Sequence, residues 1–352
     1  MDTELLNIRE RVLTASSNRT SLQLHGANTK DFYGESSVGE PLDVSAYRGI
    51  IDYEPSELVI SARCGTPLAE IEAALEECGQ FLAFEPPRFG RDPTLGGIIA
   101  TGLSGPRRLQ VGAARDFVLG ATLMGADGEL LRFGGQVMKN VAGFDVARLL
   151  CGSLGIFGII TESSLKVLPK PRAEQTLRLQ MPAREAVAAF NRWAGQPVPI
   201  SAAAWHDGAA WLRLSGAEPA VQAACAVIGG ERVAAGVAND WWSSLRHYTH
   251  PLFSGARLWR VSVPPTAAPL QLPVEPLIDW GGALRWYAGD LTAFEIRKLA
   301  AAAGGTAMRW RGGESEPRFH PLPPALLEIH RRLKRSFDPN GLFNPGRLLP
   351  GL

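Results

Sequence analysis

The sequence contains few cysteines, and none of them has metal-binding spacing. Only four occur, Cys64, Cys78, Cys151 and Cys225, and no two of them form a CxxC pair. So few cysteines do not make a disulfide framework. Without CxxC pairs the chain cannot by itself hold an ordinary cysteine-ligated iron–sulfur cluster or zinc ribbon. We therefore expect each cysteine to be a small buried apolar side chain, and we expect no metal site.

Charge imbalance and long apolar runs are also missing. The 352 residues include 36 Lys and Arg against 35 Asp and Glu, a formal net charge of +1. This balance gives no argument for binding nucleic acid or an anionic membrane surface. No run of about 18 apolar residues occurs, and residues 1–11 are charged and amphipathic, unlike a secretory signal. We expect a cytoplasmic protein with no direct membrane span, which partners could hold at the inner face of the cell membrane.

Two common nucleotide-binding motifs are absent as well. Neither glycine cluster has the GxGxxG pattern of a Rossmann fold directly after a first strand, and no GxxxxGK[ST] loop occurs. What the chain does have is a dense run of glycine and small residues at 93–105, PTLGGIIATGLSG, without the spacing of an ordinary helix or strand. Glycine lets the backbone approach a ligand closely. An earlier turn at Gly26 and a later cluster at 143–158 make three separate loops, which indicates a large anionic cofactor.

The first half of the chain alternates short strands with one clear helix. Thr66 is expected to cap a helix that starts at Pro67 and stops at Gly79, since Leu68, Ile71, Leu75 and Cys78 recur at helical spacing. The flanking strands would complete a β-α-β unit, and residues 126–128 form a hairpin turn. Strands are expected at 22–24, 58–62, 81–84, 118–123, 130–133, 156–160 and 164–168.

Two prolines at 169 and 171 mark a domain boundary. Beyond it, helices at 183–193, 219–228 and 292–303 alternate with strands at 176–180, 202–205, 210–214, 259–263, 283–287 and 307–310. This pattern predicts an α+β domain with an antiparallel sheet covered on one face. Segments 205–216 and 280–289 resemble each other weakly, as in a two-fold repeat. A last helix at 324–337 leads to a tail, 337–348, that we expect to be a structured turn.

These residues carry a resemblance to the vanillyl-alcohol-oxidase (PCMH) type of FAD-binding protein. The loop 24–34, the run 93–105, the segments 140–145 and 152–161, and the ending FDPNGLFNPG at 337–346 are similar to that family's loops and to the ending of its 2-hydroxyacid branch. More narrowly, the chain resembles the FAD-binding E subunits of glycolate oxidase (glycolate dehydrogenase). The resemblance implies an α+β fold: a PCMH-type FAD-binding domain of two α+β subdomains at 1–170, an antiparallel-sheet cap domain at 171–318, and a C-terminal helix and tail at 319–352 that return to the FAD domain.

The same resemblance implies the residues that would hold FAD. Backbone groups of Gly26, Ala27, Asn28, Thr29 and Lys30 would meet the diphosphate. Pro93, Thr94, Leu95, Gly96, Gly97, Ala100, Thr101 and Gly102 would follow the ribityl chain and the isoalloxazine, with Ser104, Gly105 and Arg107 close behind. Gly143, Phe144, Asp145, Gly158, Ile159 and Ile160 would close the adenine and flavin sides. Arg107 or its neighbour Arg108 either neutralises cofactor charge or is a solvated surface residue. No histidine stands where the family forms a covalent flavin bond, so FAD should be non-covalent.

Catalytic residues are not identifiable in the sequence. Related 2-hydroxyacid dehydrogenases have a motif near HxGDGNxH in the second domain, and it is absent here. His247 and His250 have HxxH spacing, but Pro251 follows at once, and a structural or interface role is favoured over metal binding. Arginines 246, 257 and 260 either hold a substrate carboxylate or form surface ion pairs. Tryptophans 241, 242 and 259 are expected in a core or a subunit interface.

Cofactor loops without a substrate motif predict an FAD-carrying subunit of a glycolate or 2-hydroxyacid dehydrogenase. It would relay electrons, or organise the complex, beside a catalytic FAD-bearing subunit and an iron–sulfur subunit. One alternative is a self-sufficient flavin oxidase or dehydrogenase whose substrate site uses arginines. Another is a non-catalytic scaffold that has lost flavin, because Ala27 and Asn28 stand where the family prefers glycines.

Overall fold

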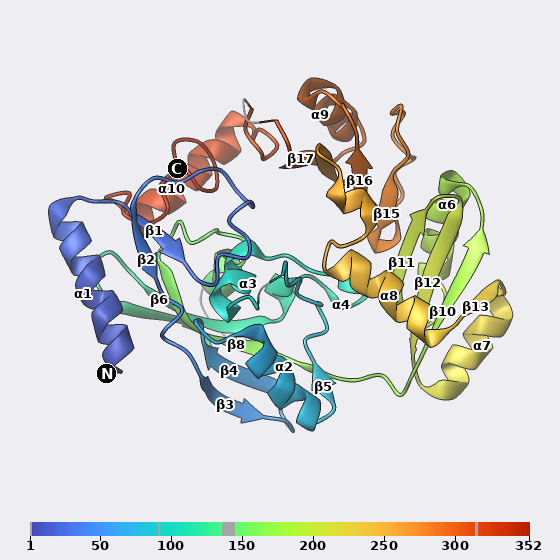
Figure 1. Cartoon of the computed structure of the whole chain (residues 1–352), viewed down its shortest axis with the longest axis horizontal. Helices are drawn as coiled ribbons and strands as arrows, with labels where there is room; N and C mark the ends of the chain where they lie inside the picture. Colours follow the sequence, from blue (N-terminus) through green and yellow to red (C-terminus); the bar gives the residue numbers. More distant parts are fainter. Residues whose placement is uncertain (1, 91, 136–144, 314–315) are drawn as a thin grey trace. The chain divides into compact units, whose positions relative to one another are not determined.

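The computed structural model describes residues 2–90, 92–135, 145–313 and 316–352. Its contacts divide the chain into two compact units. The first unit comprises Met1–Leu103, Ala113–Pro169 and Pro321–Leu352, and the second comprises Ser104–Gly112 and Lys170–His320. The N-terminal and C-terminal helices both belong to the first unit (Figure 1). No helix in the described ranges is long and apolar enough to cross a bilayer.

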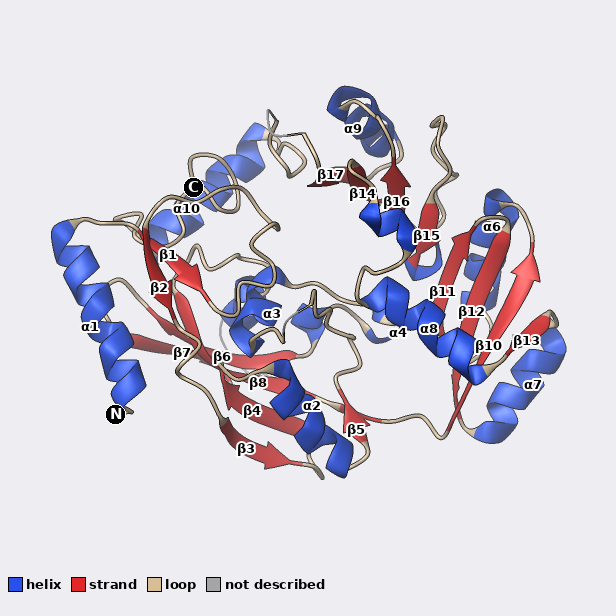
Figure 2. Ribbon diagram, in the orientation of Figure 1, coloured by secondary structure: helices blue, strands red, loops and turns tan. Residues whose placement is uncertain are grey.

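The first unit is built around three small sheets (Figure 2). Strands β1 (Leu22–His25) and β2 (Glu40–Asp43) pair in parallel. An antiparallel sheet has the order β3-β4-β8-β6-β7, and β5 pairs with β9. The remaining elements are α1 (Thr3–Asn18), β3 (Ile50–Glu54), β4 (Val59–Arg63), α2 (Leu68–Glu77), β5 (Gln80–Phe81), α3 (Leu95–Thr101), β6 (Val118–Met124), β7 (Leu130–Gly134), α5 (Val146–Leu150), β8 (Ile159–Lys166), β9 (Leu168–Pro169) and α10 (Pro324–Phe337).

One core of this unit joins the two ends of the chain. Helix α1 buries Leu5, Ile8 and Val12, whose spacing of three and four residues places them on one face. They pack in one cluster with Leu22 of β1 and with Phe343 of the C-terminal tail, all nearly or completely buried. The tail is therefore part of the first unit's core.

The second unit is one eight-stranded antiparallel sheet whose order, β13-β10-β12-β11-β15-β16-β14-β17, is symmetric about its centre. The first half runs β10 (Ala173–Gln180), α6 (Ala183–Ala194), β11 (Ile200–His206), β12 (Ala209–Gly216), α7 (Glu218–Ile228) and β13 (Glu231–Val233). The second runs β14 (Leu258–Ser262), β15 (Leu277–Asp279), β16 (Leu284–Ala288), α9 (Ala293–Ala302) and β17 (Thr306–Arg311), with residues 263–276 in place of a first helix. Strands β12 and β16 occupy equivalent places, in agreement with the predicted repeat.

Helices cover both faces of the first half of this sheet, which differs from the predicted single covered face. Leu177 of β10 lies in the core beneath α6 and α7. The next residue back, Thr176, accepts a hydrogen bond from the indole Nε1 of Trp242 on α8 (Ala235–Arg246) at 2.9 Å. Because adjacent strand residues point to opposite faces, α8 covers the other side. The sequence did not predict α8, and a short α4 (Arg108–Val111) was also missed.

The fold class is confirmed, and most predicted elements lie within one or two residues of those observed. Four local predictions were wrong. The run at 93–105 contains helix α3, whose N-cap is Thr94. Residues 156–168 form one long strand, β8, and the short β9. β5 pairs with β9 and does not join the β4 sheet, so no β-α-β unit forms. The N-cap of α2 is Pro67, and Thr66 instead bonds Gly49 and Arg63 through its hydroxyl.

Two cysteines also differ from expectation. Cys64 and Cys225 are buried, but Cys78 is exposed and Cys151 is partly exposed. Cys78 continues the apolar spacing of α2, but the helix ends at Glu77, and Cys78 is the exposed C-cap residue that follows it.

The tail is attached to the first unit by a buried ammonium group. Lys334 Nζ donates to the carbonyl oxygens of Ile156 at 2.6 Å and Phe343 at 2.8 Å, and to Asp338 Oδ2 at 2.6 Å. Asp338 Oδ1 and Oδ2 accept from the backbone N–H groups of Leu342 and Phe343. Burial lowers the pKa of Lys334, and the Asp338 carboxylate opposes that shift.

Replacing Lys334 by Met should lower the free energy of unfolding by about 3 kcal/mol or more, because the Asp338 carboxylate would stay buried without its cation. Urea unfolding followed by circular dichroism measures this. Arg335→Met, at an exposed position on the same helix, is the control and should change stability by less than about 0.5 kcal/mol. Equal effects of the two substitutions would contradict the assigned role.

Candidate cofactor site

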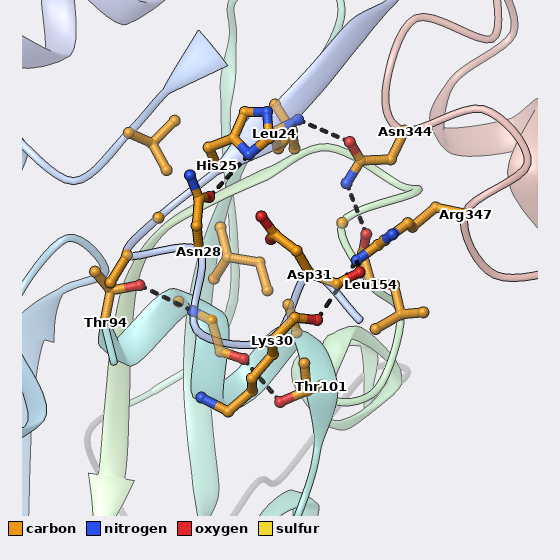
Figure 3. A pocket seen from close by; sticks show the side chains of 18 of the residues that line it. Leu24, His25, Asn28, Lys30, Asp31, Thr94, Thr101, Leu154, Asn344 and Arg347 are labelled. Atoms are coloured by element: carbon orange, nitrogen blue, oxygen red, sulfur yellow. Dashed lines mark hydrogen bonds between the residues drawn. The ribbon is translucent and has the colours of Figure 1, made fainter. Parts of the chain in front are cut away.

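A cavity in the first unit is lined by four segments that are far apart in the sequence (Figure 3). They are the end of β1 with the loop after it, helix α3 and its N-cap, the stretch from Leu154 into β8, and the C-terminal tail; Val44, directly after β2, adds one further residue. The lining residues are Leu24, His25, Gly26, Ala27, Asn28, Thr29, Lys30, Asp31, Tyr33, Val44, Thr94, Gly96, Gly97, Ala100, Thr101, Leu154, Gly155, Gly158, Ile159, Ile160, Asn344 and Arg347.

The loop after β1 presents a row of backbone donors. Within the part of the chain that the structure describes, the N–H groups of residues 26–30 donate to no protein acceptor. Only Asn28 of this turn needs a positive φ, +56°, which asparagine tolerates better than most residues. Its side-chain Oδ1 lies 2.9 Å from His25 Nδ1. Ala27 does not need a positive φ and is therefore compatible with the turn.

Gly26 allows this loop to touch the N-terminus of α3. A Cβ atom on Gly26 would lie 2.5 Å from Thr94 Oγ1. That hydroxyl is buried and fixed, because it accepts a hydrogen bond from the Gly97 N–H at 3.2 Å. On the next turn, Thr101 Oγ1 donates to the Gly97 carbonyl at 2.8 Å. The small residues of this helix thus bring two backbone segments together at the cavity.

Lys30 supplies the cavity with a buried cationic side chain. Its Nζ lies 3.3 Å from Thr29 Oγ1 and 5.8 Å from the centre of the Phe89 ring. The residue is 7% exposed. Burial lowers the pKa of Lys30 to about 8, although the Asp92 carboxylate opposes the shift. An anion placed in the cavity would favour the charged form of this lysine.

The tail residues Asn344 and Arg347 line the cavity but were not among the predicted site residues. Asn344 Oδ1 accepts from the Leu24 N–H, and Asn344 Nδ2 donates to the Leu154 carbonyl, both at 2.7 Å. Arg347 donates to the carbonyls of Glu35 at 2.7 Å and Asp31 at 2.8 Å. The available signal was the Asn-Pro-Gly ending, which was interpreted as a structured turn and as a family-like ending that returns to the FAD domain, without a role for Asn344 or Arg347 in the site.

The structure brings many of the predicted residues to this cavity. Those lining it are Gly26, Ala27, Asn28, Thr29, Lys30, Thr94, Gly96, Gly97, Ala100, Thr101, Gly158, Ile159 and Ile160. Leu95 is the first residue of α3, and Pro93 and Gly102 lie just outside the helix; none of the three lines the cavity. Asp145 caps helix α5 through the Arg148 N–H. Gly143 and Phe144 lie outside the described residues.

Three predicted residues belong instead to the second unit. The Gly105 carbonyl accepts from Trp280 Nε1 at 2.9 Å, and Ser104 precedes it. Arg107 is buried and pairs with Glu174 at 2.8 Å. The neighbouring Arg108 guanidinium lies 4.2 Å from the centre of the Trp280 ring.

The other candidate residues of the second unit do not converge. His250 packs edge-on against His206, with ring centroids 4.9 Å apart, and its Nδ1 accepts from the Leu252 N–H. Burial, with a smaller effect of His206, lowers the pKa of His250 to about 4. Among described residues, no group of three or more His, Cys, Asp or Glu side chains could hold a metal.

The arginines and tryptophans named with them lie in separate environments. Arg257 pairs with Asp290, while Arg260 lies 5.1 Å from the Trp280 ring and 5.8 Å from the Trp286 ring. The ring of Trp241 stacks on Trp211 at 4.5 Å. Trp242 and Trp259 are buried in the unit itself.

Substituting Gly26 by Ala should destabilise the protein by about 1–3 kcal/mol, because the added methyl group displaces the fixed Thr94 hydroxyl. Thermal unfolding measures the change. In the Thr94→Ala background the same substitution should cost clearly less, because the clashing atom is gone. Gly236→Ala, where a Cβ meets nothing within 4 Å, is the control and should leave stability unchanged or slightly raised. A Gly26→Ala protein as stable as wild type would disprove the close approach.

Comparison with known proteins identifies the family of the chain. Residues 6–134 match the family described as FAD binding domain, and residues 321–348 match the C-terminal domain of FAD linked oxidases. Glycolate oxidase subunit GlcE of Escherichia coli (strain K12) is 48% identical over 340 residues, which cover 96% of this chain and 95% of that protein. Glycolate oxidase subunit GlcD of Bacillus subtilis (strain 168) is 35% identical over 128 residues, 36% of this chain and 27% of that protein.

A solved structure of a more distant protein has a similar fold. Alkyldihydroxyacetonephosphate synthase superposes with a TM-score of 0.65 over 96% of this chain and 74% of its own, at 15% identity. The identity to the E. coli protein over almost the whole of both chains is what establishes the family. The chain belongs to the family of FAD-linked oxidoreductases that includes glycolate oxidase subunit GlcE, and its cofactor is FAD.

Proposed function

We propose that this protein is the FAD-binding subunit of a multi-subunit dehydrogenase for glycolate or a related 2-hydroxy acid. The N–H groups of residues 26–30 carry the proposal together with the buried Lys30, because these residues line the cavity and their N–H groups donate to no acceptor among the described residues. Backbone N–H groups and a lysine ammonium together suit a diphosphate, which has several anionic oxygens. FAD contains such a group between its flavin and adenine parts.

The cavity has a volume of about 120 Å³. Pockets that enclose a whole drug-sized ligand have roughly 300 Å³ or more, so this cavity suits the diphosphate and its immediate neighbours, and the rest of FAD would extend beyond it. In this proposal the residues 26–30 would hold the diphosphate, and residues of α3 would contact the adjoining part of the cofactor. The remaining candidates that line the cavity are Thr94, Gly96, Gly97, Ala100, Thr101, Gly158, Ile159 and Ile160.

We further propose that this subunit passes electrons or organises the complex, while a partner oxidises the substrate. The E. coli relative is named as one subunit of glycolate oxidase, and the name of the B. subtilis relative is that of another. Bound FAD exchanges electrons singly or in pairs, which lets a protein connect two-electron oxidation to one-electron iron–sulfur carriers. The partners in this proposal are a catalytic flavoprotein subunit and an iron–sulfur subunit.

An alternative is that the chain oxidises the 2-hydroxy acid itself. Arg260 is the observation in its favour, because its Nε is buried without an acceptor among the described residues and an arginine is suited to bind a carboxylate in two-point contact.

An absorption spectrum of the purified chain with FAD, before and after anaerobic glycolate or D-lactate, separates these possibilities. We expect bound flavin bands that persist when substrate is added. Bleaching by substrate in the single chain would support the self-sufficient enzyme. The absence of bound flavin even after FAD addition would overturn the proposed cofactor role. It would favour the remaining alternative, a non-catalytic scaffold that has lost flavin.

FAD affinity should fall as pH rises from about 7 to 9.5. Lys30 loses its charge near pH 8 in the free protein, whereas the bound diphosphate favours the protonated form, so binding above pH 8 takes up a proton. The dissociation constant should therefore increase by up to about tenfold per pH unit in that range. Flavin fluorescence titrations measure it. Lys30→Arg should remove this pH dependence, and a pH-independent wild type would refute the role of Lys30.

A further inference from the structure

The C-terminal tail contacts both ends of the loop that carries residues 26–30. At the near end it extends the β1 backbone: the Leu22 N–H donates to the Leu342 carbonyl at 2.7 Å, and the Asn344 N–H donates to the Leu22 carbonyl at 2.9 Å. The tail thus runs beside the strand from which the loop leaves.

Asn344 fixes the start of the loop to the opposite wall of the cavity. It is 6% exposed, and both of its amide groups are used: Oδ1 on the Leu24 N–H and Nδ2 on the Leu154 carbonyl (Figure 3). Gly155 permits this approach, because a Cβ there would lie 2.8 Å from Asn344 Nδ2. One side chain therefore sets the distance between the start of the loop and the turn at 154–155.

Arg347 holds the other end of the loop. Its guanidinium donates to the carbonyls of Asp31 and Glu35, and at 3.5 Å to that of Lys30. In return, the Glu35 N–H donates to the Arg347 carbonyl at 2.9 Å. These bonds go to backbone atoms, so they fix the course of the chain just after the row of N–H groups.

We infer that Asn344 and Arg347 are positioning residues that set the shape of the loop 26–30, and that docking of the tail and binding of a diphosphate at this loop form one coupled equilibrium. The second of these two claims, the coupling to diphosphate binding, rests on the proposed cofactor role of the loop. Donors aimed at one anion must be held in place before binding, because otherwise part of the binding free energy is spent on ordering them. A group bound at the loop in turn stabilises the docked tail by mass action.

The test uses Asn344→Gly, which removes the amide but accepts the positive φ of +43°, and Arg347→Ala, at a partly exposed position. Hydrogen exchange of the FAD-free protein is measured by mass spectrometry at the end of the loop that each variant does not contact. Asn344→Gly is read at the Tyr33 amide, which donates to the Lys30 carbonyl, and Arg347→Ala at the Leu24 amide. We expect exchange at the distant end to accelerate about tenfold or more, since both ends depend on one docked tail.

The second measurement is the dissociation constant for FAD from fluorescence titration. Both variants should bind FAD about tenfold or more weakly, and Arg347→Lys, which keeps a donor, should recover part of the loss. Asn340→Ala in the exposed turn of the tail and Arg335→Ala on α10 are matched controls and should stay within about twofold of wild type. Added FAD should also slow exchange in the wild-type tail at residues 342–347.

The two measurements separate this inference from the cofactor proposal. If wild-type protein binds no FAD, the proposed function fails, while exchange at the distant loop end still decides the positioning role. Weaker FAD binding with unchanged distant exchange would overturn positioning, since the two residues would then act only by touching the cofactor. Unchanged exchange and unchanged affinity in both variants would overturn the inference as a whole.

Discussion

The need to satisfy a buried ammonium group organises the first unit. Lys334 has only three N–H bonds to offer, and the structure provides one carboxylate and two carbonyls that come from the β8 approach, the end of α10 and the tail. A buried charge without such partners would be expensive. The position of this one atom therefore determines where α10 ends and where the tail turns back, and the tail in turn supplies a wall of the cavity more than 300 residues from the loop it faces.

The cavity depends more on backbone than on side-chain chemistry. Its donors at residues 26–30 are peptide groups, which every residue except proline provides, so the sequence can vary at position 27 without losing them. Side-chain size is restricted only at the few places where backbone segments lie close together, such as Gly26 beside Thr94. The loop can therefore present these donors with Ala27 and Asn28 in its turn.

Local sequence patterns predicted most of the described strands and the helices α2, α6, α7, α9 and α10, because apolar spacing and proline or glycine at the ends act over a few residues. They did not predict α1, α4, α5 and α8. Helix α3 was missed because it contains two glycines, which are unfavourable within a helix. The capping role of Thr94 became evident only in the structure. The pairing of β5 with β9 and the roles of Asn344 and Arg347 depend on contacts between distant segments. No single-sequence pattern encodes those contacts, although the loops at 26–30 and 94–101 could be recognised from their small residues.

The symmetric strand order of the second unit has a consequence for how that unit folds. Each half pairs its own strands along extended ladders, as in the eight residue pairs of β10 with β12, whereas the halves meet between β11 and β15 at a single aligned pair, Trp205 with Ile278. Contacts within a half join segments that are near in sequence. Forming them closes shorter loops, which costs less conformational entropy than joining the two halves. We expect the strand ladders within each half to form first, and the pairing of β11 with β15, together with the packing of Ile278 into the core of the first half, to form later.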